Sequence, residues 1–168
     1  MAQHKVVQFK YAEILGNAVT TSQVFTGDSS GQSNCGSKIA EITMTPKNAN
    51  NKILLDVSIP IVGESGDHSY GYGSAIYQDS SNNAISLWLL VREHNDQGGV
   101  LGQGNANHQD NCAYVCSTDA GSTTERTYKL HFGCSGGNAN INGAGGYWPD
   151  SVGTNIQSLF TATEIEEI

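Results

Sequence analysis

The chain has 168 residues, of which 38% are hydrophobic and only 14% are charged, and its 20 glycines accompany many Asn, Ser and Thr residues. Its 16 acidic and 8 basic residues give a formal net charge of -8, which disfavours nucleic-acid phosphates and anionic membrane surfaces as partners. The chain has no apolar run of membrane-spanning length and no apolar signal-peptide core near its start. We therefore expect a soluble protein made in a cytoplasm, with one domain over residues 1–168.

The first part of the chain predicts short strands separated by polar turns. Within residues 38–45, every second residue from Ala40 to Met44 is apolar, which is typical of a strand with one solvated face. We expect Pro46 to end this strand, because proline cannot donate a ladder hydrogen bond. The predicted strands here are residues 5–15, 20–25, 38–45 and 52–62.

The second part of the chain continues the same pattern around one long loop. Residues 84–92 are apolar almost throughout, and periodicity does not decide between a buried strand and one helical turn. Residues 93–111 form a loop longer than a compact domain usually carries without a role, so we expect this loop to make contacts. The other predicted strands are residues 75–78, 112–117, 126–133 and 156–165. Strands joined by turns, with no alternation of strands and helices, predict an all-β sandwich or jelly roll.

The four cysteines are Cys35, Cys112, Cys116 and Cys134, and their spacing is neither that of a zinc site nor that of a disulfide-rich secreted fold. Cys112 and Cys116 share a face of one predicted strand, but they are too far apart there to bond to each other. We expect free thiols packed as small apolar groups. The histidines are scattered singly, and we expect no structural metal and no cofactor.

Polar side chains that can bind a cation or contact a partner are concentrated in the long loop. Carboxylate and imidazole groups can bind a cation, but a solvated loop that touches a partner is the simpler interpretation. The predicted partner contacts in this loop are Glu93, His94, Asn95, Asp96, His108 and Asp110.

Two tyrosines in a glycine-rich stretch are further candidate partner contacts. Tyr70 and Tyr72 follow Asp67 and His68, an arrangement that suits a sugar-binding platform. Tyrosine is also enriched at contacts between subunits, and we favour that interpretation. A core or interface position is likewise expected for both tryptophans, Trp88 and Trp148.

Two stretches have the G-x-S-x-G spacing of a hydrolase nucleophile elbow, at residues 27–31 and 133–137. Neither is followed by a predicted helix, and a chain rich in Gly and Ser produces such matches by chance. We therefore expect turns at both places, no catalytic residue and no enzyme. The acidic end, residues 164–168, is expected to be a solvated edge, with basic residues of a partner as the alternative.

Six segments follow one another along the chain: VVQ, TPKNANNKILLDVSIPIV, AIYQDSSNNAI, STTERTYKLHFG, NANING and TATEI. Their order resembles that of a family of virion proteins from tailed bacteriophages. The resemblance covers most of residues 6–165, and the chain departs from it in the long loop, the SLWLLV run and the cysteines. It implies a jelly-roll β-sandwich like that of tumour necrosis factor and the complement globular heads, which is usually a homotrimer.

The resemblance leaves two virion roles open. Family members occur most often as tips of tail fibres behind long shafts, whereas Met1 here lies only a few residues before the first predicted strand. We therefore expect a free-standing capsid decoration or cement protein that binds the major capsid protein of the assembled shell. Such a protein would lie on the capsid surface after assembly in the host bacterial cytoplasm. The alternative is a fibre tip or adhesin that recognises a host surface glycan, and a hydrolase is the third class.

We expect the trimer to cover apolar strand surface that one small sandwich leaves exposed. Residues 53–62 and 87–91 are the predicted source of this surplus, because they are the most apolar strand segments.

Overall fold

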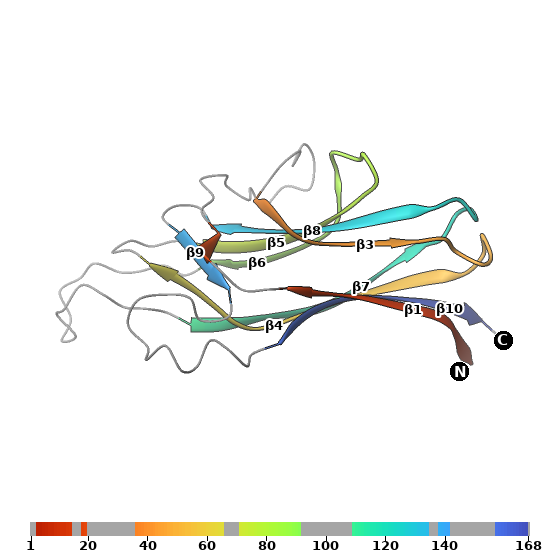
Figure 1. Ribbon diagram of the computed structural model, residues 1–168, viewed down its shortest axis with the longest axis horizontal. Coiled ribbons are helices and arrows are strands. Elements are labelled where there is room, and N and C mark those ends of the chain that lie inside the picture. Colours follow the sequence, from red (N-terminus) through yellow and green to blue (C-terminus); the bar gives the residue numbers. More distant parts are fainter. Residues whose placement is uncertain are drawn as a thin grey trace.

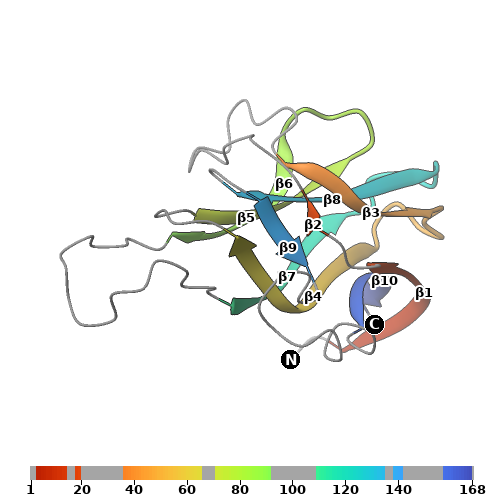
Figure 2. The same cartoon turned by 60° about the vertical axis from the view of Figure 1, so that its left-hand side comes forward.

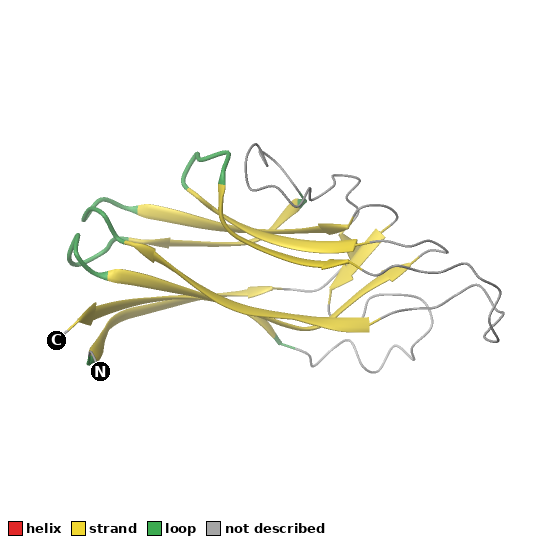
Figure 3. Cartoon of the chain, turned by 180° about the vertical axis from the view of Figure 1, so that it is seen from behind, coloured by secondary structure: helices red, strands yellow, loops and turns green. Residues whose placement is uncertain are grey.

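The computed structural model describes residues 3–14, 18–19, 36–65, 71–91, 109–134, 138–141 and 157–167. All regular structure within these residues is extended, with ten strands and no helix (Figure 3). The strands form two antiparallel sheets that lie face to face, so the chain is a β-sandwich and the all-β class is confirmed (Figure 1). The described residues include no helix that could cross a membrane.

The first sheet, sheet A, has β4 at its centre. β10 pairs with β4 over residues 52–58, β9 pairs with the far end of β4 over residues 62–65, and β7 pairs with it over residues 52–63. β1 lies outside β10, and β2 lies outside β9. The strands of sheet A are β1 (His4–Ile14), β2 (Ala18–Val19), β4 (Lys52–Ser65), β7 (Gln109–Asp119), β9 (Asn138–Ile141) and β10 (Ser158–Glu167).

The second sheet, sheet B, contains four of the described strands in the order β3, β8, β5, β6. Figure 2 shows it as a separate layer beside sheet A. Each pair of neighbouring strands in this sheet is antiparallel. The strands are β3 (Ser37–Met44), β5 (Gly71–Gln78), β6 (Ala84–Val91) and β8 (Arg126–Cys134).

The core lies between the sheets and is built from alternate residues of each strand. On β4, Ile53, Leu55, Val57 and Ile59 have no exposed surface, and they pack in one cluster with the inward side chains of β8, including Phe132. The sandwich therefore buries the apolar side of residues 53–59 by itself. Alternation along the strand points these side chains into the core, so they leave no apolar surplus for a partner. Leu54 lies on the opposite face and is partly exposed, so the surplus expected from residues 53–62 and 87–91 stays a prediction.

β3 follows its predicted pattern closely. Ala40, Ile42 and Met44 are buried, Glu41 and Thr43 are exposed, and the strand ends before Pro46. The second proline of this region does not end its strand. β4 continues to Ser65, and its pairing with β7 shifts register between Ile59 and Val62, around the exposed Pro60. A β-bulge accommodates the missing N–H group.

Other elements settle or refine the expectations from the sequence. Residues 84–91, for which the pattern left a buried strand and a helical turn open, form a strand. Residues 109–111 belong to β7, so the predicted loop is shorter at its end. β9 lies inside a Gly and Asn run that was not predicted to pair, and β2 covers residues 18–19. The strand predicted at residues 20–25 lies outside the described residues.

One end of the sandwich is closed by two described turns. The β3–β4 turn (residues 45–51) and the β7–β8 turn (residues 120–125) lie at the end where both termini lie (Figure 1). The two turns are joined by backbone hydrogen bonds, from Ala120 N to Asn51 O at 2.9 Å and from Gly121 N to Ala49 O at 3.0 Å. Gly121 has a φ of 66°, a conformation that glycine adopts without strain.

Candidate functional site

The face of sheet A that points away from the core carries exposed apolar side chains. Val6, Phe9 and Tyr11 on β1 are 61%, 55% and 61% exposed, and Val115 on β7 is 63% exposed. We call this surface the outer face of sheet A. Monomeric soluble proteins rarely gather large apolar side chains on one surface, so it is the described surface best suited to a partner.

The strand register shows that four strands share this face. In each row, a side chain of β1 lies beside one of β10, then one of β4 and then one of β7. The rows mix apolar side chains with short polar ones, as protein interfaces do. One row contains Tyr11, Thr161, Asp56 and Val115, and the next contains Phe9, Thr163, Leu54 and Ser117.

A bulge in β1 sets which of its side chains face outward. Val6 and Phe9 are three residues apart, so strict alternation would place them on opposite faces. The pairing with β10 shifts register between Val6 and Gln8, and both side chains therefore belong to the outer face. Phe9 and Tyr11 then stack, with ring centroids 6.2 Å apart and an interplanar angle of 27°.

The buried side of β7 carries two thiols and a phenol. Cys112 is fully buried and Cys116 is half-buried, and both are free thiols. Burial raises the pKa of Cys112 to about 12 and also raises the pKa of Cys116 and Tyr114. The Tyr114 hydroxyl is 2.9 Å from Ser74 Oγ. These groups are held in their protonated forms and are poor nucleophiles.

Of the predicted partner contacts, the structure describes the backbone of two. Tyr72 lies on β5 of sheet B, opposite Leu90, whereas Asp110 lies on β7 of sheet A, opposite Val62. The two therefore belong to different sheets. The other predicted contacts lie outside the described residues: Glu93, His94, Asn95, Asp96, His108 and Tyr70.

The remaining sequence candidates are placed only in part. Trp88 on β6 is half-buried and packs against the core, and Trp148 lies outside the described residues. The first G-x-S-x-G stretch also lies outside them, and the second begins at the end of β8, where only residues 133–134 are described. Within the described ranges, no three His, Cys, Asp or Glu side chains gather as a metal site would require.

Glu164 on β10 is fully buried, so the expectation that residues 164–168 form a solvated edge is wrong at its first residue. On this strand, Phe160, Ala162 and Glu164 alternate with more exposed residues and share the inward face. The two-residue period of this strand places Glu164 on the same face as Phe160 and Ala162, but a charged carboxylate is rarely buried and therefore favours a solvated position.

The Glu164 carboxylate is held by four uncharged donors. Burial alone would raise its pKa, but these hydrogen bonds outweigh burial and hold the pKa below its usual 4.5. Oε2 accepts from Gln8 Nε2 at 2.5 Å, and Oε1 accepts from Asn51 Nδ2 at 2.7 Å, Lys47 N at 2.8 Å and Asn48 N at 3.3 Å. We call these five residues the Glu164 clamp.

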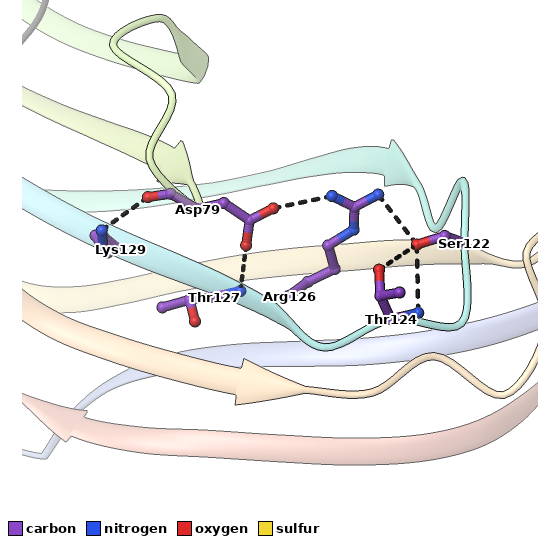
Figure 4. A network of polar contacts seen from close by, with 6 residues as sticks. All are labelled: Asp79, Ser122, Thr124, Arg126, Thr127 and Lys129. Carbon is purple, nitrogen blue, oxygen red and sulfur yellow. Dashed lines mark hydrogen bonds and ion pairs between the residues drawn. The ribbon is translucent and has the colours of Figure 1, made fainter.

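A second carboxylate network, centred on Asp79, ties together two turns beside sheet B (Figure 4). Asp79 has a φ of 54°, in the left-handed region. Its carboxylate accepts from Thr127 N at 2.8 Å and from Arg126 Nη1 at 2.9 Å, and its carbonyl accepts from Lys129 Nζ at 2.7 Å. Arg126 also donates to Ser122 Oγ at 3.2 Å. The groups of this network bond to one another, which indicates a structural role.

Comparisons with known proteins assign no family to the chain. No family model matches it, and no curated protein matches it. Among solved structures, it matches the crystal structure of dimeric latent PorU from Porphyromonas gingivalis with a TM-score of 0.41 and 8% sequence identity. The match covers 97% of this chain and 13% of that chain. A likeness this weak carries no argument about function.

Proposed function

We propose that this chain is a structural protein of a tailed-bacteriophage virion, a capsid decoration or cement protein that binds the assembled shell as a homotrimer. The observation that supports the homotrimer best is the exposed apolar outer face of sheet A, with Val6, Phe9, Tyr11 and Val115. The virion role follows from the resemblance of the strand segments to virion proteins. The role is structural and not enzymatic, and the protonated, buried thiols of β7 agree with it.

The proposal includes a jelly-roll fold of the tumour necrosis factor type. When the short strands β2 and β9 are set aside, the first strand pairs with the last and the second pairs with the second to last. The third strand, β4, lies between β10 and β7, and the fourth, β5, lies between β8 and β6. An antiparallel ribbon wrapped into two sheets has this order, which favours a jelly roll over other sandwiches.

A closed ring of three copies would cover the outer face of sheet A. Covering Phe9, Tyr11 and Val115 removes apolar surface from water in every copy, which is the main driving force for association. Cyclic symmetry gives every copy the same contacts and leaves no open end.

A trimer also explains how weak contacts to a shell would suffice. Three copies engage three shell sites at once, so modest individual affinities combine through effective concentration. A protein that binds only the assembled lattice stabilises that lattice by mass action.

The alternative, a fibre tip or adhesin that binds a host glycan, is favoured by one observation. Phe9 and Tyr11 form an exposed stacked pair, and aromatic faces of this kind stack on the apolar side of a sugar ring. Thr161 and Thr163 lie beside them and offer hydroxyl groups to a sugar. A trimer contact and a sugar site would both occupy the outer face of sheet A, so the same residues cannot serve both roles at once.

The test is to add the purified protein to capsid shells that lack it and, separately, to host cells. We expect the shells to capture the protein and to survive a higher temperature than bare shells. If decorated and bare shells melt together, or if labelled virions carry the protein only at the tail, the decoration role is wrong. Capture by cells, competed by soluble glycan, would support the fibre-tip alternative.

A further inference from the structure

β1 pairs with β10 along its length and buries Ile14 at its end, and its middle is tied to the β3–β4 turn through the inward side chain of Gln8. Gln8 Nε2 donates to Glu164 on β10 at 2.5 Å and to the carbonyl oxygen of Thr45, at the start of the β3–β4 turn, at 2.8 Å. The next inward position along β1 is Lys10, which is exposed at the edge of the sheet. The middle of β1 therefore depends on Gln8 for its polar attachment to the turn.

The Glu164 carboxylate organises the segments that meet at this end of the sandwich. It binds β1 through Gln8 and the β3–β4 turn through Lys47, Asn48 and Asn51. Asn51 is itself buried, and its carbonyl accepts from Ala120 in the β7–β8 turn. A change in the charge of this one carboxylate therefore acts on β1 and on the adjoining turn together.

Charged side chains around the clamp do not replace its neutral donors. Lys10 and Glu166 occupy the neighbouring inward positions of β1 and β10, and the Lys47 side chain is exposed. From sheet B, burial raises the pKa of the Tyr128 hydroxyl and the negative charges of Glu164 and Asp79 help to raise it, while Arg126 is paired with Asp79 in a separate network. The negative charge of Glu164 is thus stabilised by N–H groups alone, and those groups lose a charged acceptor when the carboxylate is protonated.

We propose that the Glu164 clamp is an acid-sensitive latch, in which the carboxylate holds β1 on the sandwich near neutral pH and its protonation releases β1. Because β1 carries Val6, Phe9 and Tyr11, release also separates the copies of the homotrimer. This second step rests on the proposed function, whereas the first does not.

The direction of the pH effect follows from the pKa of Glu164. Burial would raise it, but the donors of the clamp hold it below 4.5, so the folded state binds the proton more weakly than the unfolded chain does. The latch stabilises the folded state fully at pH values above 4.5, the ordinary pKa of a glutamate. It loses that stability as the pH falls through the lowered pKa.

Hydrogen exchange followed by mass spectrometry tests the latch on the full-length protein. Protection factors, corrected for the intrinsic effect of pH, are measured for the β1 segment and for the β8 segment at about pH 7 and at a series of pH values that descends from 4.5, because the pKa of Glu164 lies below that value. We expect β1 protection to fall at least about tenfold at low pH while β8 keeps its protection. In Glu164→Gln, β1 protection should already be low at neutral pH and should change little with pH.

Two further variants keep the result decisive. Gln8→Met removes only the donor on β1 and should release β1 at neutral pH, even if Glu164→Gln does not fold. Glu167→Gln removes an exposed carboxylate from the same strand and should behave as the wild type. The latch is wrong if β1 and β8 lose protection together, or if Gln8→Met protects β1 as fully as the wild type.

The oligomeric state at the same pH values separates the two proposals. Release of β1 together with dissociation of the trimer supports both. Release of β1 from a protein that is monomeric at neutral pH supports the latch and contradicts the homotrimer. Release of β1 without dissociation of a trimer contradicts the coupling.

Discussion

The two outer surfaces of the sandwich differ in chemistry although both sheets share one core. On sheet B, the outward side chains of β3 and β8 are polar, with a 2.8 Å ion pair between Lys38 and Glu41 and a 3.3 Å contact between the hydroxyls of Thr43 and Thr127. On sheet A, β1 and β7 present aromatic and β-branched side chains instead. Outward side chains do not pack in the core, so the difference concerns only what each surface can contact. The polar outer surface of β3 and β8 suits water, and the apolar outer face of sheet A is the one to which our proposal assigns a partner.

The largest expected effect comes from placing a charge on the apolar surface. Tyr11→Glu should raise the dissociation constant of the trimer about 100-fold or more, since truncation or charging of a central aromatic contact costs about 3 kcal/mol. Sedimentation velocity over a concentration series measures it. Thr43→Glu, on the outer face of sheet B, is the matched control and should leave assembly unchanged. Equal effects of the two variants would remove the distinction between the surfaces.

The next effect concerns the clamp beneath β1. Glu164→Ala leaves four donors without their buried acceptor and should lower the free energy of unfolding by about 3 kcal/mol. Urea titration of a monomeric background, such as Tyr11→Glu, isolates this effect from assembly. Glu167→Ala, with an exposed side chain on the same strand, should change it by less than about 0.5 kcal/mol. A clamp variant as stable as that control would contradict the structural role of Glu164.

The Asp79 network should respond more weakly, because its ion pair is partly solvated. The side chains of Arg126 and Asp79 are 26% and 36% exposed, and Asp79→Asn should cost about 1 kcal/mol, with less lost at high salt. Asparagine tolerates the left-handed backbone at this position, so the change tests charge and not strain. Urea titrations at low and high salt measure the difference, and a cost independent of salt would argue against the ion pair.

The smallest effect is expected for the ion pair on the outer face of sheet B. Glu41→Gln removes the partner of Lys38, where both side chains are well exposed, and it should leave the thermal unfolding midpoint unchanged within the precision of calorimetry. A measurable loss would show that this surface contributes more to stability than its solvation indicates.

Alternating segments made most of the fold predictable from the sequence. β3 shows the reason, since only one face of its pattern suits a core and a proline ends it. β9 was missed because Asn and Gly dominate its four residues, and pairing with β4 and β2 outweighs their low strand propensity.

The candidate interface was less predictable than the core. The alternation along β1 was visible, but a pattern does not say whether its apolar side covers the core or faces a partner, and the bulge after Val6 changes the phase. Glu164 was assigned to solvent because a carboxylate is rarely buried, and its donors lie more than 100 residues away in the chain. Only tertiary structure brings such donors together.

Multi-angle light scattering of the wild-type protein at micromolar concentration and neutral pH tests the central claim most directly. The outer face of sheet A, as a contact between copies, predicts the mass of three chains of 17.8 kDa each. The mass of a single chain, with the aromatic pair on β1 still open to solvent, would contradict it.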